Sequence, residues 1–312
     1  MINERTAVAI VGPTCSGKTE VGIELAKLTD GEVISADARQ IFKLINIGTA
    51  KPAKEELAGV PHHLVDILSL EEEISAGAFS QLAVRIANEI FSRNHLPIIV
   101  GGSGLYLRAM VDGLFDAPEI SAEVRSALRK RLREEGSEKL LEELRQVDPD
   151  AAKNLLPQNF KRILRGLEVF HSSGKRISEL RRERPSEIGF ETIQFGILLD
   201  RKLLYQRIEK RVGEMISRGL VEETKEILRR GFDPNLNSLQ TVGYKEVIAF
   251  LQKKIKFEEM VNLIKMNTRR YAKRQMTWFN KDKRIIWIEC DNTPPSEIAV
   301  EIQARLGKAQ IA

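Results

Sequence analysis

Cysteine is scarce in this chain of 312 residues, which has two, Cys15 and Cys290, far apart in the sequence. Two widely separated cysteines exclude a disulfide framework and a clustered zinc site, so we expect both thiols to be reduced. The chain has four histidines, of which His62 and His63 are adjacent, and they too lack the spacing of metal ligands. The sequence therefore implies no transition metal.

Long apolar runs are also lacking. No segment approaches the roughly 18 uninterrupted apolar residues that a membrane span needs. The first five residues lead straight into the short apolar segment TAVAIVG at residues 6–12, without a basic leader and a long apolar stretch behind it. We therefore expect a cytoplasmic protein with no membrane-embedded segment, long enough to bury a sizeable core.

Positive charge is in slight excess, with a formal net charge of +5. Its distribution is more informative than its sum, because basic residues gather in three segments, residues 125–133, 160–185 and 267–284. Any one of these segments alone is compatible with a solvated helix face. Three of them in one chain favour a polyanionic partner such as a nucleic acid.

Short apolar segments rich in valine and isoleucine indicate buried parallel strands. They cover residues 7–12, 32–37, 63–68, 96–102, 193–200 and 284–290. Amphipathic stretches of helical length separate the early ones, as in residues 18–28 and 76–93. This alternation of strand and helix predicts an α/β fold with a doubly wound parallel sheet.

The alternation stops after about residue 114. Residues 117–188 have a helical pattern throughout, with Pro118 and Ser121 as signals for a helix start and Gly136 for a helix end. Because this stretch separates the fourth expected strand from the fifth, it is predicted to be a helical insertion. Residues 1–116 and 189–312 then form the α/β core, which ends in further long helices.

A phosphate-binding loop follows the first expected strand. Residues 12–19, GPTCSGKT, fit the P-loop pattern G-x-x-x-x-G-K-[ST] between a strand and a helix. Backbone N–H groups of such a loop point at a phosphate, the lysine neutralises it and the final hydroxyl can ligate Mg²⁺. The predicted diphosphate-binding residues are Gly12, Pro13, Thr14, Cys15, Ser16, Gly17, Lys18 and Thr19. We expect Mg²⁺ as the cofactor and Thr19 as its protein ligand.

Two more segments leave the same expected edge of the sheet. Asp37 follows the second strand, and the glycine-rich residues 101–104, which include Ser103, follow the fourth. Ligands of open α/β sheets bind at this edge, where Asp37 can hold Mg²⁺ through water or accept a proton. Alternatively, Asp37 caps the loop that follows it, and the glycines form a structural turn. Lys51 is a candidate second cation for the phosphates.

A P-loop alone fits a kinase, a nucleoside triphosphatase or a transferase with a diphosphate leaving group. Further segments narrow the choice: ISADARQIFKLINIGTAKP, HHLVDI, VGGSGLYLRAMVDGL, RILRGLEVF, TVGYKEV and KRQMTWF. In this order, and together with the P-loop, they resemble the tRNA dimethylallyltransferase family, also called tRNA isopentenyltransferases. GTAKP and KRQxTWF are specific to that family and its close relatives.

The resemblance implies a P-loop nucleoside-triphosphate-hydrolase-like core with a helical insertion, acting on dimethylallyl diphosphate and tRNA. It implies transfer of the dimethylallyl group to the exocyclic N6 of the adenine 3′-adjacent to the anticodon, with release of diphosphate. Asp37 matches the catalytic base, Lys18 serves the leaving diphosphate, and Ser103 stands where the family usually has a substrate-contacting threonine. Arg207 lies in the segment that supplies an active-site arginine, and Arg211 is its close rival.

The resemblance also assigns contacts with the anticodon stem-loop of tRNA, the expected partner of a monomeric enzyme. The matching residues are Asp37, Ala38, Arg39, Gln40, Ser103, Arg125, Lys161, Arg162, Ile163, Leu164, Arg165, Gly243, Tyr244, Lys273, Arg274, Gln275, Thr277 and Trp278. Three positions depart from the family pattern, since Ala38 replaces a serine, Ser103 a threonine and Phe160 an aspartate. The changes at 38 and 160 remove polar groups from predicted RNA contacts.

Three other functions remain compatible with a P-loop core. A nucleotide or small-metabolite kinase explains the core, but neither the basic C-terminal helix nor the GTAKP loop. A prenyltransferase for free adenine nucleotides keeps the chemistry, but the basic insertion and KRQMTWF argue against it. An RNA-binding nucleoside triphosphatase needs a Walker B aspartate, for which Asp66 in HLVDI is the candidate.

Overall fold

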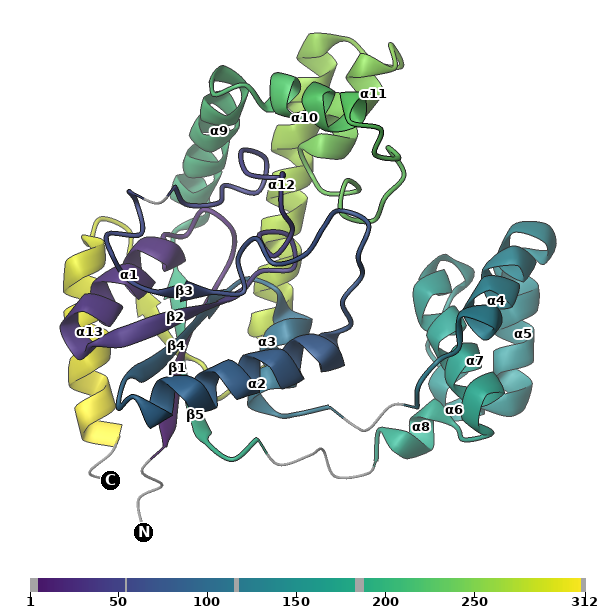
Figure 1. The fold of residues 1–312 in the computed structure, drawn as a ribbon, viewed down its shortest axis with the longest axis horizontal. Coiled ribbons are helices and arrows are strands. Elements are labelled where there is room, and N and C mark those ends of the chain that lie inside the picture. Colours follow the sequence, from purple (N-terminus) through teal and green to yellow (C-terminus); the bar gives the residue numbers. More distant parts are fainter. Residues whose placement is uncertain (1–4, 54, 115–117, 183–187, 310–312) are drawn as a thin grey trace. The chain divides into compact units, whose positions relative to one another are not determined.

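The computed structural model describes residues 5–53, 55–114, 118–182 and 188–309 (Figure 1). The chain divides into two compact units, which we call the core unit, Met1–Val111 with Ile188–Ala312, and the helical unit, Asp112–Glu187. Of the expected boundaries of the insertion, residue 117 lies outside the described residues, and Ile188 is already part of the core unit.

The core unit contains a six-stranded sheet in the order β3-β2-β4-β1-β5-β6, in which every pairing is parallel. Its strands are β1 Thr6–Val11, β2 Gly31–Ala36, β3 His62–His63, β4 Leu96–Gly101, β5 Glu191–Leu198 and β6 Ile286–Glu289. The central β1 lies between β4 and β5, which precede and follow the insertion in the sequence. The expected parallel α/β sheet is confirmed.

The third strand is shorter than the sequence predicts. Residues 63–68 were expected to form it, but β3 is limited to His62 and His63. Leu64 and Asp66 have φ values of 63° and 57°, in the left-handed region, so the chain turns away from the sheet there. The apolar pattern of HLVDIL therefore reflects packing of a bent loop, and the prediction of a full strand was wrong.

Helices cover both faces of the sheet, as the alternation of apolar side chains along β1 requires. Val8 and Ile10 face a cluster formed with α1 Lys18–Thr29 and α13 Pro295–Ala309. Ala7 and Ala9 face the opposite cluster, which includes α2 Ala76–Ser92 and α3 Gly104–Val111. Figure 1 shows α1 and α13 together on one side of the strands, with α2 on the other.

Four further helices of the core unit follow β5. They are α9 Arg201–Ser217, α10 Leu220–Arg229, α11 Tyr244–Leu251 and α12 Phe257–Phe279. The long α12 runs from α11 back to α3 beside the sheet (Figure 1). It therefore brings the C-terminal part of the chain to the loops at the carboxyl ends of β1, β2 and β4.

The helical unit contains α4 Ala122–Glu135, α5 Ser137–Val147, α6 Pro149–Ala152, the 3₁₀ turn η1 Pro157–Asn159, α7 Phe160–Ser173 and α8 Ile177–Leu180. As predicted, Ser121 caps α4, since its hydroxyl accepts the Val124 N–H at 3.3 Å, and Gly136 ends the helix with a φ of 83°. Leucine side chains of α5 and α7 form its separate core. In the described part of the chain, we find no helix with the length and apolar character needed to span a bilayer.

Candidate active site

The P-loop connects β1 to α1 and owes its shape to two glycines. Gly12 has a φ of 146°, and a Cβ there would lie 2.9 Å from the Ile197 carbonyl oxygen. Gly17 precedes α1 with a φ of 94°, which is left-handed backbone that favours glycine. The Ser16 hydroxyl is buried, and no group of the described residues hydrogen-bonds to it. An anion in the loop would supply the missing acceptor.

Lys18, the first residue of α1, folds over this loop. Its Nζ donates to the Pro13 carbonyl oxygen at 2.6 Å. Burial, helped by the positive charge of Arg211, lowers the pKa of Lys18 to about 8, although the Asp37 carboxylate opposes the shift. A partly buried ammonium with one carbonyl partner is well suited to bind a multiply charged anion, which would stabilise its protonated form.

A pocket of about 350 Å³ opens beside the P-loop within the core unit. Its walls come from the loops after β1, β2, β3 and β4 and from α1, α9 and α12. The residues of the predicted site that line it are Thr14, Cys15, Gly17, Lys18, Thr19, Asp37, Gln40, Lys51 and Arg211. The phosphate loop and the acidic residue of the second strand therefore meet in one pocket, as the strand-edge argument predicts.

One carboxylate oxygen of Asp37 caps the turn that follows it. Its Oδ1 accepts the backbone N–H groups of Arg39 at 2.8 Å and Gln40 at 3.3 Å. For Oδ2, the described residues provide no hydrogen-bond donor. The two alternatives raised by the sequence are thus compatible, because capping fixes the carboxylate while leaving one oxygen available in the pocket.

Ser103 lies behind the pocket wall and acts on the same turn. Its Oγ accepts the Ala38 N–H at 2.9 Å, and its own N–H donates to the Ala36 carbonyl oxygen at 3.3 Å. Tyr271 lies nearby, and its pKa is raised by burial and by the Asp37 carboxylate. Tyr271, which lines the pocket, is therefore a protonated phenol at neutral pH.

Gln275 on α12 joins two of these loops. Its Oε1 accepts the Thr14 N–H at 2.8 Å, and its Nε2 donates to the Gly102 carbonyl oxygen at 2.9 Å. The side chain is only 6% exposed. A Cβ on Gly102 would lie 2.2 Å from the Gln275 amide nitrogen, and one on Gly104 2.3 Å from the Trp278 ring. These glycines are therefore required for the close approach of α12.

Two arginines of α9 approach the phosphate loop. Arg211 lines the pocket and lies close enough to Lys18 to lower its pKa. Arg207, one helical turn earlier, has a guanidinium nitrogen 3.8 Å from a Cβ built on Gly17. Both side chains are thus beside the P-loop, Arg211 on the pocket side and Arg207 near the start of α1.

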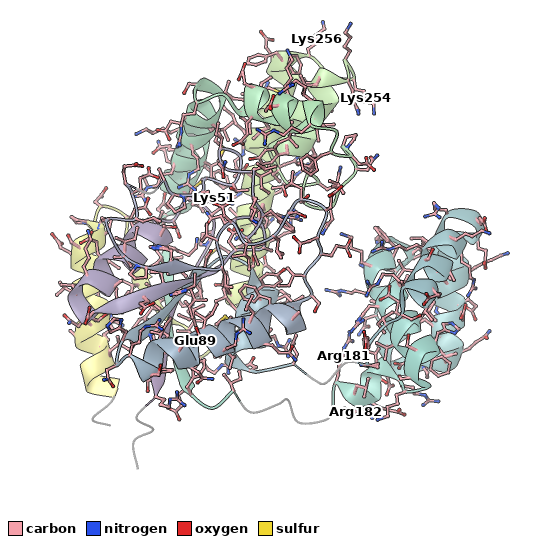
Figure 2. The ribbon with its side chains drawn as sticks, in the orientation of Figure 1. Lys51, Glu89, Arg181, Arg182, Lys254 and Lys256 are labelled. Carbon is pink, nitrogen blue, oxygen red and sulfur yellow. The ribbon has the colours of Figure 1, made fainter. Side chains whose placement is uncertain are left out.

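Lys51 lines the pocket, but its ammonium is already bound by other groups of the protein. Its Nζ is buried and donates to the Phe42 carbonyl oxygen at 2.8 Å, to Asn46 Oδ1 at 2.9 Å and to the carboxylate of Asp66. Because an ammonium has three donors, these partners use all of them. Figure 2 shows Lys51 within the body of the core unit, whereas Lys254 and Lys256 lie at its periphery. The interpretation of Lys51 as a second phosphate cation is therefore corrected, and Asp66 is its structural partner.

The residues predicted to contact RNA differ in how exposed their side chains are. Those with exposed side chains are Lys161, Arg162, Lys273, Arg274, Thr277 and Trp278, and those partly exposed are Ala38, Arg39, Gln40, Ser103, Arg125 and Arg165. Arg125 and residues 161–165 belong to the helical unit, and the others belong to the core unit. The positive and aromatic side chains among them lie on the surface, where a nucleic acid can reach them.

Five of the residues predicted to contact RNA are buried. Tyr244 and Ile163 are 0% exposed, Leu164 is 9% exposed, and Gln275 and Gly243 are also buried. Ile163 and Leu164 pack in the core of the helical unit, while Tyr244 packs in that of the core unit. These side chains have little or no exposed surface in this structure, and the RNA contacts expected at these positions stay predictions.

Sequence reasoning overlooked several residues of the pocket. Ser35, Glu20 and Met215 line it without having been singled out. A usable signal was the helical period, because Arg207, Arg211 and Met215 recur at intervals of four residues on one face of α9. Tyr271 and Gln275 have the same spacing on α12.

A P-loop at the carboxyl edge of a parallel sheet, with a carboxylate in the same pocket, defines a phosphate-binding enzyme of the P-loop α/β class. Comparison with known proteins narrows this class. The chain matches the IPP transferase family over residues 40–282. Since this match covers most of its length, the chain belongs to that family.

Individual relatives are similar over nearly the whole chain. It is 45% identical over 281 residues to tRNA dimethylallyltransferase 1 of Pelobacter propionicus, covering 90% of this chain and 91% of the relative. It is 44% identical over 298 residues to the tRNA dimethylallyltransferase of Geobacillus thermodenitrificans, with coverages of 95% and 93%.

Solved structures have the same fold. The full-length tRNA isopentenylpyrophosphate transferase of Bacillus halodurans superposes with a TM-score of 0.74 at 36% identity, covering 98% of this chain and 97% of that one. A eukaryotic dimethylallyltransferase, described in crystallographic snapshots as acting on tRNA, gives a TM-score of 0.85 at 27% identity, with coverages of 98% and 80%.

Proposed function

We propose that this chain transfers a dimethylallyl group from dimethylallyl diphosphate to the exocyclic N6 of the adenine 3′-adjacent to the anticodon of tRNA. Membership of the IPP transferase family and the names of its relatives support the proposal. The observation that carries it is the meeting of the P-loop and Asp37 in one pocket. Such a pocket can hold a diphosphate and deprotonate an acceptor at the same time.

Asp37 is the proposed catalytic base. The lone pair of an adenine amine is delocalised into the ring, so the amine is a weak nucleophile. As N6 forms its bond to C1 of the dimethylallyl group, the C1–O bond to diphosphate breaks and one N6 proton moves to Asp37. The oxygen proposed to take that proton is Oδ2, because Oδ1 accepts the N–H groups of Arg39 and Gln40.

The P-loop and its cations are proposed to stabilise the leaving diphosphate. Negative charge grows on the diphosphate as the C1–O bond breaks, and the loop amides, Lys18 and Arg211 are already positioned for it. Lys18 would exchange the Pro13 carbonyl for a phosphate oxygen. Loss of one such donor typically lowers the rate by about 10² to 10³. Arg207 is the proposed second arginine, on the α1 side of the loop.

Mg²⁺ is the proposed cofactor. Thr19 lines the pocket as the last residue of the P-loop motif, and the orphaned Ser16 hydroxyl lies in the same loop. Among residues placed by the structure, no cluster of three or more His, Cys, Asp or Glu side chains is arranged to hold a metal. This donor set fits Mg²⁺, which is commonly held by few protein ligands together with phosphates and water. When bound, the ion would neutralise diphosphate charge.

tRNA is the proposed acceptor molecule, and the enzyme is proposed to act as a cytoplasmic monomer. Exposed Lys273 and Arg274 on α12, with Lys161 and Arg162 on α7, offer phosphate contacts. Trp278 is 38% exposed and can stack a base. Taking the adenine out of a single-stranded loop costs only a few kcal/mol, which such contacts can offset.

Mass spectrometry of nucleosides tests the proposal. The purified protein with Mg²⁺ is incubated with unmodified tRNA and dimethylallyl diphosphate, in parallel with ATP as donor and with AMP as acceptor. We expect the mass of one dimethylallyl group on adenosine in tRNA, only with dimethylallyl diphosphate. Phosphate transfer from ATP to a small acceptor would identify a kinase, and prenylation of AMP alone would identify the free-nucleotide class.

A further inference from the structure

One wall of the pocket is a short loop after β2, residues 45–51, which we call the wall loop. Ile47, Thr49 and Ala50 of this loop line the pocket. Ala50 has a φ of 48°, a left-handed conformation that an alanine adopts only when its surroundings impose it. The shape of the pocket therefore depends on whatever holds the wall loop in place.

The N-terminal half of the wall loop is held by two side chains from the distant α10 and α11. Glu223 accepts the backbone N–H groups of Asn46 and Ile47, each at 3.1 Å. The hydroxyl of Tyr244 accepts the N–H of Gly48 at 3.0 Å and donates to Glu223 at 2.5 Å. Three consecutive backbone N–H groups of the wall loop therefore donate to Glu223 or Tyr244, and these two side chains are hydrogen-bonded to each other.

The environment of this pair keeps it in one arrangement. Tyr244 is 0% exposed, and a Cβ on Gly48 would lie 2.5 Å from its ring, so the wall loop rests directly on the phenol. Burial, together with the charge of Glu223, raises the pKa of Tyr244 far above its usual value. The phenol therefore stays protonated and continues to donate to Glu223. Hydrogen bonds to a charged carboxylate are among the stronger ones in proteins.

Separate contacts fix the C-terminal half of the wall loop. The Nζ of Lys51 binds Asn46 Oδ1 and the Phe42 carbonyl oxygen, and Gln40 Nε2 donates to the carbonyl oxygens of Thr49 and Ala50, each at 3.2 Å. These contacts come from the loop's own neighbourhood in the sequence. The pair Glu223 and Tyr244 is the part of the support that comes from the C-terminal helices.

We propose that Glu223 and Tyr244 are positioning residues for the prenyl donor, holding the wall loop in the conformation that closes the donor pocket. Neither residue lines the pocket, so their effect is carried by the backbone of Asn46, Ile47 and Gly48. The assignment of the donor rests on the proposed function. Loss of the pair removes the acceptors of these three N–H groups and lets the wall loop move.

Steady-state kinetics of Tyr244→Phe and Glu223→Gln test the proposal, with each substrate varied while the other is saturating. Tyr244→Phe keeps the ring and removes the hydroxyl, and Glu223→Gln keeps the shape and weakens the acceptor. The matched control is Thr224→Val, which removes a buried hydroxyl that bonds only to the Leu220 carbonyl oxygen within α10. Hydrogen exchange of the Asn46, Ile47 and Gly48 amides is followed in the same proteins.

We expect either variant to raise KM for dimethylallyl diphosphate about tenfold, as loss of one charge-assisted hydrogen bond would. KM for tRNA should stay near the wild-type value, and the three amides should exchange faster. The double variant should be no worse than the more affected single variant, because both act through one network. Thr224→Val should lower the melting temperature without changing either KM.

Equal donor KM values in Tyr244→Phe and wild type, or slow exchange of the three amides in both, would overturn the proposal. So would a rise in KM for Thr224→Val as large as that for Glu223→Gln. If Tyr244→Phe does not fold, Glu223→Gln and the exchange of the wild-type amides decide. Wild-type protein that transfers no prenyl group to tRNA would refute the proposed function instead, so the two failures are distinguishable.

Discussion

The protonation state of Lys18 depends on the groups around it in the pocket. Its ammonium is partly desolvated and lies near Arg211, and both conditions disfavour its charged form, so its pKa falls to about 8. The ammonium of Lys18 therefore loses its proton more readily than that of an ordinary lysine. A bound diphosphate reverses this tendency, because it replaces lost hydration with direct opposite charge.

The pH dependence of kcat/KM for dimethylallyl diphosphate should report this pKa. The charged form of Lys18 predominates below its pKa of about 8, so kcat/KM should be highest below that pH and decline as the pH rises through it. Lys18→Arg cannot lose its charge in this range. It should lower kcat/KM by about 10² to 10³ because its geometry is wrong, and it should abolish the alkaline decline. The same decline in Lys18→Arg would contradict the assignment.

The roles of some residues could be predicted from the sequence, and those of others could not. Lys18, Thr19 and Asp37 follow from a local motif and from their place at the ends of strands. The partner of Tyr244 does not, because Gly48 is 196 positions away and its amide gives no sequence signal. Lys51 was misinterpreted for the same reason, since only the fold brings Asp66 and the Phe42 carbonyl oxygen to its ammonium.

The helix α12 contributes more than a basic surface. Its exposed residues were evident from the sequence as a charged run, but the buried Gln275 on the same helix joins the P-loop to the loop after β4. A buried amide with both ends hydrogen-bonded restricts the position of both partners. The helix therefore sets the distance between the phosphate cradle and the turn that contains Ser103.

Gln275→Ala should disturb the P-loop without removing a charge. It leaves the Thr14 N–H and the Gly102 carbonyl oxygen unpaired, which costs about 1 to 3 kcal/mol for each buried group. We expect a lower melting temperature and a donor KM raised by about tenfold or more. Thr268→Ala is the control, because its hydroxyl bonds only to the Ile264 carbonyl oxygen of α12 itself. An unchanged donor KM in Gln275→Ala would show that the bridge does not support the loop.

Five of the expected strands were predicted correctly and one was not, and the difference has a physical reason. The strands β1, β2, β4, β5 and β6 were found because both faces of the sheet are covered, which makes each strand continuously apolar. The expected strand at residues 63–68 had the same apolar composition. It fails because Leu64 and Asp66 adopt left-handed backbone, which composition does not encode.

At the scale of the whole molecule, the pocket and the predicted RNA-contacting residues are distributed differently over the two units. The described core unit contains the entire pocket, whereas the predicted RNA-contacting residues occur in both units. The net charge of +5 is too small to explain binding to a polyanion by itself. Affinity for tRNA should therefore depend on particular basic residues and not on overall charge.

Salt dependence of tRNA binding distinguishes these possibilities. Lys273→Ala with Arg274→Ala removes two exposed charges of α12. The slope of log K against log salt concentration should become shallower by about 1.5, from two lost phosphate contacts. Lys254→Ala with Lys256→Ala removes the same charge from the periphery of the core unit (Figure 2) and should leave the slope unchanged. Equal slopes for the two double variants would show that Lys273 and Arg274 are solvent-exposed residues that do not contact tRNA.

One pocket is proposed to hold the leaving diphosphate and to deprotonate the acceptor through Asp37. Single-turnover transfer by Asp37→Ala, measured together with its Kd for tRNA, tests this most directly. Without the carboxylate, transfer to adenine N6 should be abolished, while the Kd for tRNA stays within a few-fold of that of the wild type, because tRNA binding is shared among many contacts. Transfer at a rate near that of the wild type would contradict the account.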